Sequence, residues 1–283
     1  MRFPKRVPPP FATVSVGLLF VLLALLSTAF AAAQQPVILR ASDEDARRTS
    51  TSRISTDSNG EPQPDLFFPL TPGTWWLYRG RAHWTESETN KPAATNASIK
   101  MQVERVIRKS DFTLAVISGF PADLDWSNGQ VDPKLSLLIE TRNHEVFLDE
   151  LPPDFDFAKL EKDSTALDKF LSQENLLFRW PLKKGMKFGD PESLQRSDDR
   201  YCWVVATQQR KILSEIKGIA AKPAEIFLLQ FITNPDDEQM ELSQGIGILS
   251  YQYHHHGTVA DTSLTLVEFH PAQLPAPTSG AKP

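Results

Sequence analysis

The sequence predicts a mainly β protein, built as a single antiparallel sheet that is strongly curved or barrel-like, with one inserted helix near residues 154–173. Short runs of alternating apolar and polar residues fill most of the chain, and such alternation is typical of strands with one buried face. Turn-forming residues separate these runs. Only one stretch, DFDFAKLEKDSTALDKFLSQ, shows helical spacing. A lone helix in such a protein covers an opening or an edge of the sheet.

The first segment, residues 1–33, has the pattern of a secretory signal peptide. Arg2, Lys5 and Arg6 precede an apolar run over residues 11–30, and three alanines end the segment at residues 31–33. Cleavage after Ala31 or Ala33 fits the small-residue rule. The segment predicts export through a Sec-type pathway to the bacterial periplasm or the cell exterior. The alternative is an uncleaved N-terminal anchor, because the run approaches the roughly 20 residues that span a bilayer.

The remainder of the chain divides by composition into a linker, one large domain and a tail. Residues 34–64 are polar without apolar periodicity, which predicts a disordered linker. Residues 65–270 hold the β-rich domain, and the Pro/Ala-rich residues 271–283 are predicted to be a disordered tail. No later segment is long and apolar enough to span a membrane after signal cleavage.

Strand patterns follow one another through the large domain. The run WWLYRGRAHWT is rich in aromatic residues, and SIKMQVERVI alternates with Ile99, Met101 and Val103 on its buried side. Asn234-Pro235-Asp236-Asp237 is a turn signature, and Asp236–Glu238 are expected to form a solvated loop tip. The predicted strands cover residues 75–85, 98–107, 112–118, 134–141, 145–148, 201–208, 224–233, 239–242, 246–255 and 263–269.

The predicted helix follows Pro152-Pro153, and Asp154 or Asp156 is placed to cap its start. Its apolar positions near helical spacing are Leu160, Leu167, Phe170 and Leu171.

One pattern, P-L-x-x-G-x-x-aromatic, occurs twice: at residues 69–76 and again at 181–188. Proline restricts φ and glycine permits positive φ, so each copy predicts a tight turn that directs an aromatic side chain into the core. Either the domain consists of two similar halves, or two short matches coincide by chance.

The run HHHG ends a predicted strand, so its side chains alternate between two faces. His254 and His256 share one face, while His255 lies on the other with Tyr251 and Tyr253. Two histidines two residues apart on a strand can bind one zinc ion, but a catalytic zinc needs a third protein ligand. The other interpretation is that HHHG simply ends a strand as it enters its turn. We therefore expect no cofactor, with zinc at His254 and His256 as the alternative.

Known catalytic signatures are missing from the sequence: there is no G-x-S-x-G elbow, no phosphate-binding glycine loop and no H-E-x-x-H motif. Cys202 is the only cysteine, so no internal disulfide can form, and its apolar neighbours indicate a buried thiol. Without the three signal-peptide cations, 27 basic residues face 35 acidic ones, a net charge of about −8. That acidic balance, with no basic cluster, argues against nucleic-acid binding.

Aromatic side chains are the remaining candidates for ligand binding. They either fill a β core or line an apolar cavity, and alternation places Trp75 and Trp76 on opposite faces. The candidate ligand-binding residues are Trp75, Trp76, Tyr78, Trp84, Tyr251 and Tyr253.

The segments FFPLTPGTWWLYRG (67–80), GIGILSYQYHHHGT (245–258) and LTLVEFHP (264–271) give the chain a family likeness. It resembles a loose class of exported bacterial β-rich proteins that open with P-L-x-x-G-x-x-W-x-Y and carry a G-x-G penultimate strand. Gly73-Thr74-Trp75 is also similar to the G-x-W opening of lipocalins, which implies a barrel with an apolar cavity.

The predicted function is therefore that of an exported, non-enzymatic protein of the bacterial envelope that binds an apolar small molecule or an envelope component. Two alternatives stay open: a metal-dependent hydrolase that uses His254 and His256, and a structural surface protein.

Overall fold

Twelve strands form one antiparallel sheet in the computed structural model, which describes residues 66–86, 88–124, 134–256 and 260–272. The predicted fold class is confirmed. The strands are β1 (Trp75–Thr85), β2 (Pro92–Arg108), β3 (Phe112–Ser118), β4 (Leu135–Thr141), β5 (Glu145–Glu150), β6 (Leu176–Arg179), β7 (Lys187–Phe188), β8 (Trp203–Ile212), β9 (Pro223–Ile232), β10 (Asp236–Ser243), β11 (Gly247–His255) and β12 (Ala260–His270).

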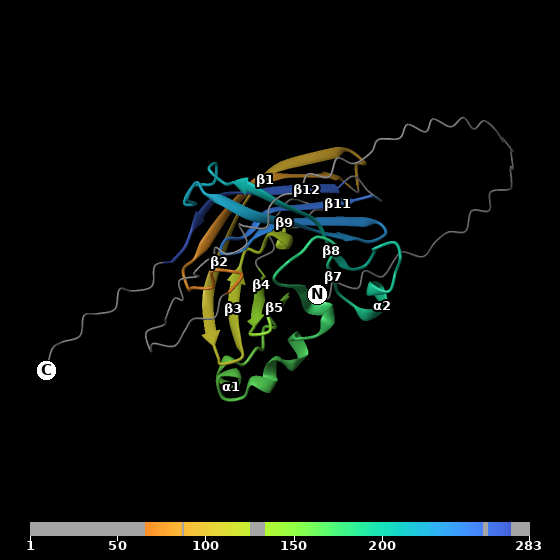
Figure 1. Ribbon diagram of the computed structural model, residues 1–283. Coiled ribbons are helices and arrows are strands. Elements are labelled where there is room, and N and C mark those ends of the chain that lie inside the picture. The colour runs from red at the N-terminus through yellow and green to blue at the C-terminus, as the bar shows by residue number, and fades with distance from the viewer. Residues whose placement is uncertain (1–65, 87, 125–133, 257–259, 273–283) are drawn as a thin grey trace, which may run out of the picture.

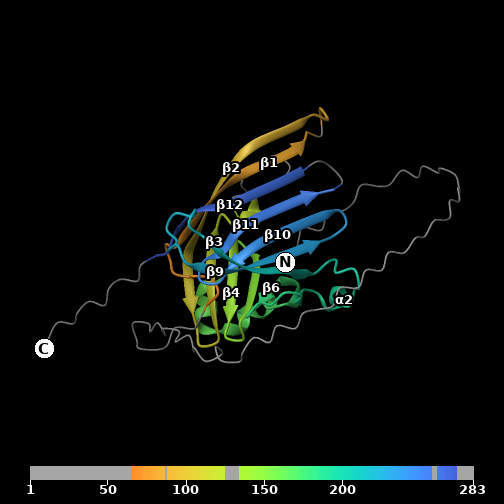
Figure 2. The same cartoon turned by 45° about the horizontal axis from the view of Figure 1, so that its top comes forward.

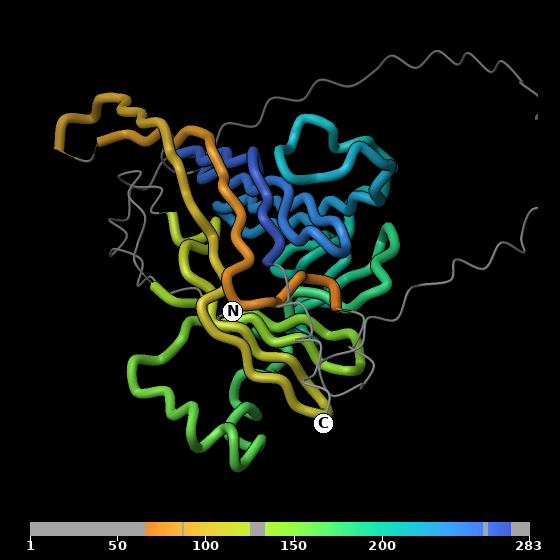
Figure 3. Tube along the Cα trace, turned by 90° about the vertical axis from the view of Figure 1, so that its left-hand side faces the viewer, coloured from red at the N-terminus to blue at the C-terminus, as the bar shows by residue number. Residues whose placement is uncertain are grey.

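The sheet consists of two six-stranded meanders joined through the first and last strands. Its order is β6-β5-β4-β3-β2-β1-β12-β11-β10-β9-β8-β7, so β1 pairs with β12 in the middle and the short strands β6 and β7 form the two edges. The sheet bends so strongly that β2 to β5 run across the layer that holds β1, β12, β11 and β9 (Figures 1 and 2). The β1–β2 hairpin extends past the rest of the sheet (Figure 3).

Glycine is required where β1 and β12 meet. A Cβ atom at Gly80 would lie 1.7 Å from the backbone oxygen of Ser263, so any side chain there would force the two strands apart.

Two buried side chains of β1 reach past β12 to the backbone at the start of β11. Trp76 donates its indole N–H to the Ile246 oxygen at 2.6 Å, and the Tyr78 hydroxyl donates to the Ile248 oxygen at 2.9 Å. Both rings are fully buried, so these hydrogen bonds fix β1 relative to β11 across the core.

The expected helix is present in two pieces. α1 (Phe157–Lys162) begins after Asp156, whose carboxylate accepts the Lys159 N–H at 3.0 Å. The backbone becomes extended at Asp163, and the 3₁₀ segment η2 (Ser164–Phe170) follows, with the Asp163 carboxylate accepting the Thr165 N–H at 3.0 Å. A second cap therefore interrupts the continuous helix that the apolar spacing predicts. The other helical segments are η1 (Pro121–Asp123), η3 (Gln173–Asn175) and α2 (Pro191–Leu194).

Both copies of the P-L-x-x-G pattern, residues 69–76 and 181–188, adopt the same turn. Gly73 and Gly185 each have φ of +85°, which favours glycine, and each turn bonds to the second strand of its own meander. Bulges follow at the same relative place in β2 and β8. That the halves arose by duplication stays a prediction. The hydrogen bonds are Gly73 N to Val103 O (2.9 Å), Val103 N to Thr74 O (2.9 Å), Gly185 N to Val205 O (2.8 Å) and Val205 N to Met186 O (2.9 Å).

Phe67 and Phe68 plug the interior where β10 turns into β11. Both rings are buried and pack on Phe178 of β6, with ring centroids 4.7 and 6.3 Å apart respectively. The buried carboxylate of Glu140, on β4, accepts the Phe67 N–H and the Phe68 N–H, each at 2.7 Å. The Phe67 oxygen in turn accepts the N–H of Gly245 at 2.8 Å. The Phe plug, residues 67–68, therefore connects both meanders.

We expect Glu140→Gln to lower the free energy of unfolding by about 2–3 kcal/mol, because the amide can accept only one of the two N–H groups and turns a donor toward the other. The change would be measured from the midpoint of urea denaturation. Glu145→Gln, on the neighbouring strand, breaks an exposed ion pair with Arg179 and should cost less than about 1 kcal/mol. Equal losses in the two variants would contradict the role of Glu140.

Candidate functional site

A polar cluster lies on the inner face of the sheet, where β10 begins and β11 ends. The strands pair antiparallel, with Asp236 opposite His255 and Glu238 opposite Tyr253. Alternation sends these four side chains and that of Tyr251 inward. We call these five residues the inner cluster. The plug lies at the other end of the same strands, about 24 Å away at the rise of an extended chain.

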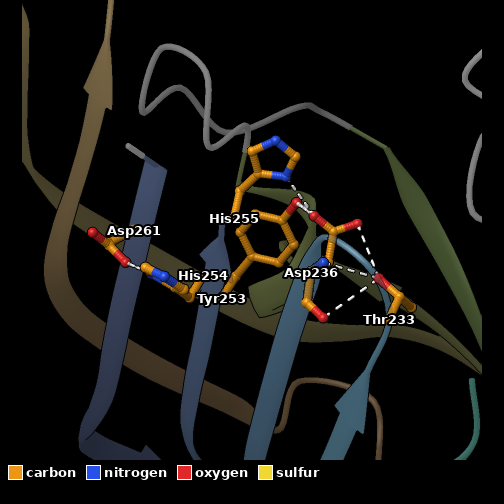
Figure 4. Close-up of polar contacts among 6 residues, drawn as sticks. All are labelled: Thr233, Asp236, Tyr253, His254, His255 and Asp261. Carbon is orange, nitrogen blue, oxygen red and sulfur yellow. Dashed lines mark hydrogen bonds and ion pairs between the residues drawn. The ribbon is translucent and has the colours of Figure 1, made fainter. Parts of the chain in front are cut away.

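Asp236 is the centre of the part of the inner cluster that reaches solvent. Its Oδ1 accepts the Tyr253 hydroxyl at 2.6 Å and lies 2.6 Å from Nδ1 of His255 (Figure 4). The Thr233 hydroxyl accepts the Asp236 N–H at 3.0 Å and lies 3.4 Å from Oδ2 of Asp236, so the turn before β10 contacts both the backbone and the carboxylate of this residue. The His255 side chain is 17% exposed and that of Asp236 is 36% exposed. This network thus forms a half-exposed rim.

Glu238 lies deeper and is fully buried. Burial raises the pKa of its carboxyl to about 7, an effect that the charge of Asp236 increases and the hydrogen bond from Tyr251 partly offsets. Its Oε1 has no hydrogen-bond partner among the described residues. The pKa of Tyr251 is also raised, first by burial and then by Glu238, with a smaller effect of Asp123 at the end of η1. A buried carboxyl that titrates near neutrality and has an unused oxygen is typical of functional sites.

Sequence reasoning missed the two acids. Asp236 and Glu238 were expected in a solvated loop tip, and that expectation is wrong: both belong to β10, and Glu238 is only 3% exposed. The turn occupies Thr233 to Pro235 instead. The alternation of Glu238, Met240 and Leu242 toward the core was the available signal, since it continues the strand to the acids.

The candidate aromatic residues occupy three different places. Trp76 and Tyr78 are core residues that donate hydrogen bonds to the backbone of Ile246, just before β11, and of Ile248 in β11. Trp75 lies half-buried on the outer face, its ring stacked on that of His270 at 5.3 Å. Trp84 is half-buried and lies on the same inner face as Tyr251 and Tyr253. It pairs with Ala260 of β12, and Ala260 pairs in turn with His255 of β11. These three residues form a row across β1, β12 and β11 that leads to the inner cluster.

The outer face of β11 carries the two histidines that were considered for zinc. Both His254 and His256 are exposed, with ring centroids 4.4 Å apart, so the predicted alternation is confirmed. Asp261 of β12 contacts Nδ1 of His254 (Figure 4). Among the described residues, no group of three or more His, Cys, Asp or Glu side chains is arranged to hold a metal ion.

A surface hollow of about 560 Å³ lies apart from the inner cluster, between the end of β5, η2, η3 and the start of α2. The hollow is lined by Asp149, Glu150, Pro152, Lys169, Phe170, Ser172, Gln173, Glu174, Asn175, Asp190 and Pro191.

Cys202 is buried, as expected, and burial raises the pKa of its thiol. No described helix has the length and apolar character needed to cross a membrane.

No protein family and no curated protein sequence matches the chain. A structure from Bacteroides fragilis NCTC 9343, described as an exported protein with YmcC-like fold, is 10% identical with a TM-score of 0.35, covering 73% of this chain and 99% of that one. A lipoprotein from Parabacteroides distasonis ATCC 8503 is 12% identical with a TM-score of 0.34 and the same coverage. A DUF1329 family protein from Desulfovibrio piger ATCC 29098 is 11% identical with a TM-score of 0.17, covering 70% and 85%. At such low TM-scores these likenesses carry no conclusion about function.

The raised pKa of Glu238 makes stability depend on pH in a defined direction. The Glu238 carboxyl keeps its proton up to about pH 7 in the folded state, whereas in the unfolded chain it releases the proton near pH 4.5. Its contribution to the free energy of unfolding is therefore largest below pH 4.5. Its contribution to the free energy of unfolding should fall by roughly 3 kcal/mol as the pH rises from 4.5 to above 7. Urea denaturation at a series of pH values measures it.

Glu238→Gln should remove this part of the pH dependence, since glutamine does not titrate. Glu241→Gln, on the opposite face of the same strand, should keep it. If the stability of Glu238→Gln falls between pH 4.5 and 7 as steeply as that of the wild type, Glu238 does not titrate near neutrality.

Proposed function

We propose that this chain is an exported, non-enzymatic binding protein whose ligand is held by the inner cluster. One observation carries the proposal: Glu238 is a fully buried carboxyl with an oxygen that no described residue satisfies. Leaving such an oxygen without a donor costs about 1–3 kcal/mol, so the fold keeps it at the expense of stability. A ligand that donates a hydrogen bond to this oxygen recovers that free energy on binding.

The surroundings of Glu238 suggest the chemistry of the ligand. Tyr251 and Tyr253 neighbour it, and Trp84 lies in the adjoining row on the same face. Aromatic rings bind apolar groups, and the carboxyl selects a donor. We therefore infer a small molecule with an apolar body and a head group that donates hydrogen bonds, an amine being favoured above pH 7, where Glu238 is charged.

The arrangement of the sheet favours entry from the rim formed by Asp236 and His255. The opposite ends of β10 and β11 are occupied by the Phe plug, whose rings are buried. The rim is half-exposed, and its carboxylate is already oriented by hydrogen bonds from Tyr253 and Thr233. Pre-oriented polar groups lower the cost of ordering the site when a ligand binds.

The export part of the proposal rests on residues 1–33, which lie outside the described residues. Expression of the full chain in a bacterium should place the protein in the periplasm or the medium, and its N-terminal sequence should begin just after Ala31 or Ala33. Fractionation and N-terminal sequencing measure both. Protein that stays in the cytoplasm with residues 1–33 intact would contradict export, and membrane-bound protein with residues 1–33 intact would show the uncleaved anchor instead.

The ligand class can be tested with octylamine, octanol and octanoate, which share an apolar body and differ in the head group. Calorimetric titration at pH 8 should give the tightest binding for octylamine and none for octanoate, which the Glu238 carboxylate repels. Glu238→Gln should weaken octylamine binding by about 10–100-fold, the loss of one charge-assisted hydrogen bond.

Glu241→Gln is the matched control for this titration and should bind octylamine as the wild type does. Octylamine binding that is the same in Glu238→Gln and wild type would contradict the assignment of the inner cluster as the ligand site.

A further inference from the structure

His83, Asp261, His254 and Asp237 form a row across the outer face of the sheet, behind the inner cluster. On β12, Asp261 is paired on one side with His254 of β11 and on the other with His83 of β1. His256 lies two residues beyond His254 and shares its face. These side chains belong to the opposite face from Glu238, so what they bind is independent of the ligand proposed above.

The contact with Asp261 determines which nitrogen of His254 is free. The carboxylate Oδ1 of Asp261 lies against Nδ1 of His254, and a carboxylate can only accept (Figure 4). Nδ1 must therefore carry the proton, which in the neutral ring leaves the Nε2 lone pair unused. A carboxylate that holds one nitrogen of an imidazole while the other binds a metal is a recurring arrangement in metalloproteins.

The spacing of the two rings suits a shared ion. Two imidazoles on one ion with bonds of about 2.1 Å have ring centroids about 4.5–5.2 Å apart when the angle at the metal is roughly 90–109°. The centroids of His254 and His256 are 4.4 Å apart with an interplanar angle of 82°. This separation is close to the lower end of that range, so the two exposed rings are near enough to each other to share one ion.

We propose that His254 and His256 bind one late first-row divalent transition-metal ion, with Asp261 as the residue that orients His254. Imidazole is a ligand that zinc, copper and nickel share, and copper(II) binds most tightly in this series. Because the described residues offer no third ligand, water completes the coordination shell and the ion remains accessible from solvent. The site is an open two-histidine site rather than a closed structural zinc site.

The experiment uses the full chain, purified without a histidine tag and titrated with CuSO₄ and with ZnCl₂ in a non-chelating buffer. We expect one ion per chain, with copper(II) bound more tightly than zinc, and nitrogen hyperfine splitting from two imidazoles in the copper spectrum. His254→Ala and His256→Ala should each abolish the two-nitrogen signal. Asp261→Asn should weaken the affinity by about 10–100-fold without changing the stoichiometry.

His83→Ala is the matched control, since His83 is exposed on the same outer face and borders Asp261 from the other side. It should bind copper as the wild type does. Circular dichroism and thermal unfolding of each variant without metal establish that the fold is intact. The proposal is overturned if the wild type binds less than one ion per chain at a tenfold excess of copper, or if the double variant His254→Ala/His256→Ala binds copper as tightly as the wild type.

A second measurement tests the orienting role without metal. Nitrogen-15 spectra of the imidazoles should show His254 with its proton on Nδ1 in the neutral ring, and the Nε2 form should gain population in Asp261→Asn. A wild-type His254 with its proton on Nε2 would overturn the role of Asp261.

Discussion

The pairing of β1 with β12 is the constraint on which the rest of the structure depends. It joins strands that are about 180 residues apart along the chain, and it converts two separate meanders into one sheet. Closing so long a loop costs conformational entropy, which is recovered through the ladder itself and through the buried hydrogen bonds of Trp76 and Tyr78 to β11. The register of this pairing also aligns β1, β12 and β11. Two rows depend on it: the inner row from Trp84 to His255, and the outer row from His83 to His254.

One strand, β11, carries opposite chemistry on its two faces. Toward the core, Tyr251 and Tyr253 form hydrogen bonds with buried or half-buried acids of β10. Toward solvent, His254 and His256 are exposed, and His254 contacts Asp261 of β12. Alternation alone separates these sets by the thickness of a single backbone. A slip of one residue would exchange them, placing two imidazoles in the core and the tyrosines in water. Correct register of β11 is therefore a requirement of both proposals, beyond its contribution to stability.

Much of the architecture could be predicted from local pattern, because strands with one buried face leave a two-residue period in the sequence. The ten longer strands and the division of HHHG between two faces were predicted in this way. The strands β6 and β7, with four and two residues, are too short to show a period. The helix near residues 154–173 was predicted as continuous because spacing does not reveal that Asp163 serves as a second cap. Glu238 was missed because NPDDE resembles a turn, and Asp261 was missed because cross-strand partners depend on register.

The two edge strands, β6 and β7, have a consequence for the protein before and after it folds. A large sheet normally ends in long rows of unsatisfied N–H and C=O groups, which recruit other chains and lead to aggregation. Here the edges have only four and two residues, and strong curvature turns the ends of the sheet toward each other. This protection is partial, because β7 pairs with β8 only at Trp203 and Val204 and leaves residues 206–212 of β8 with no strand partner on that side in the described chain. Before β1 meets β12, however, each meander exposes a long edge, so the slowest and most aggregation-prone stage of folding should be the one that precedes this last pairing.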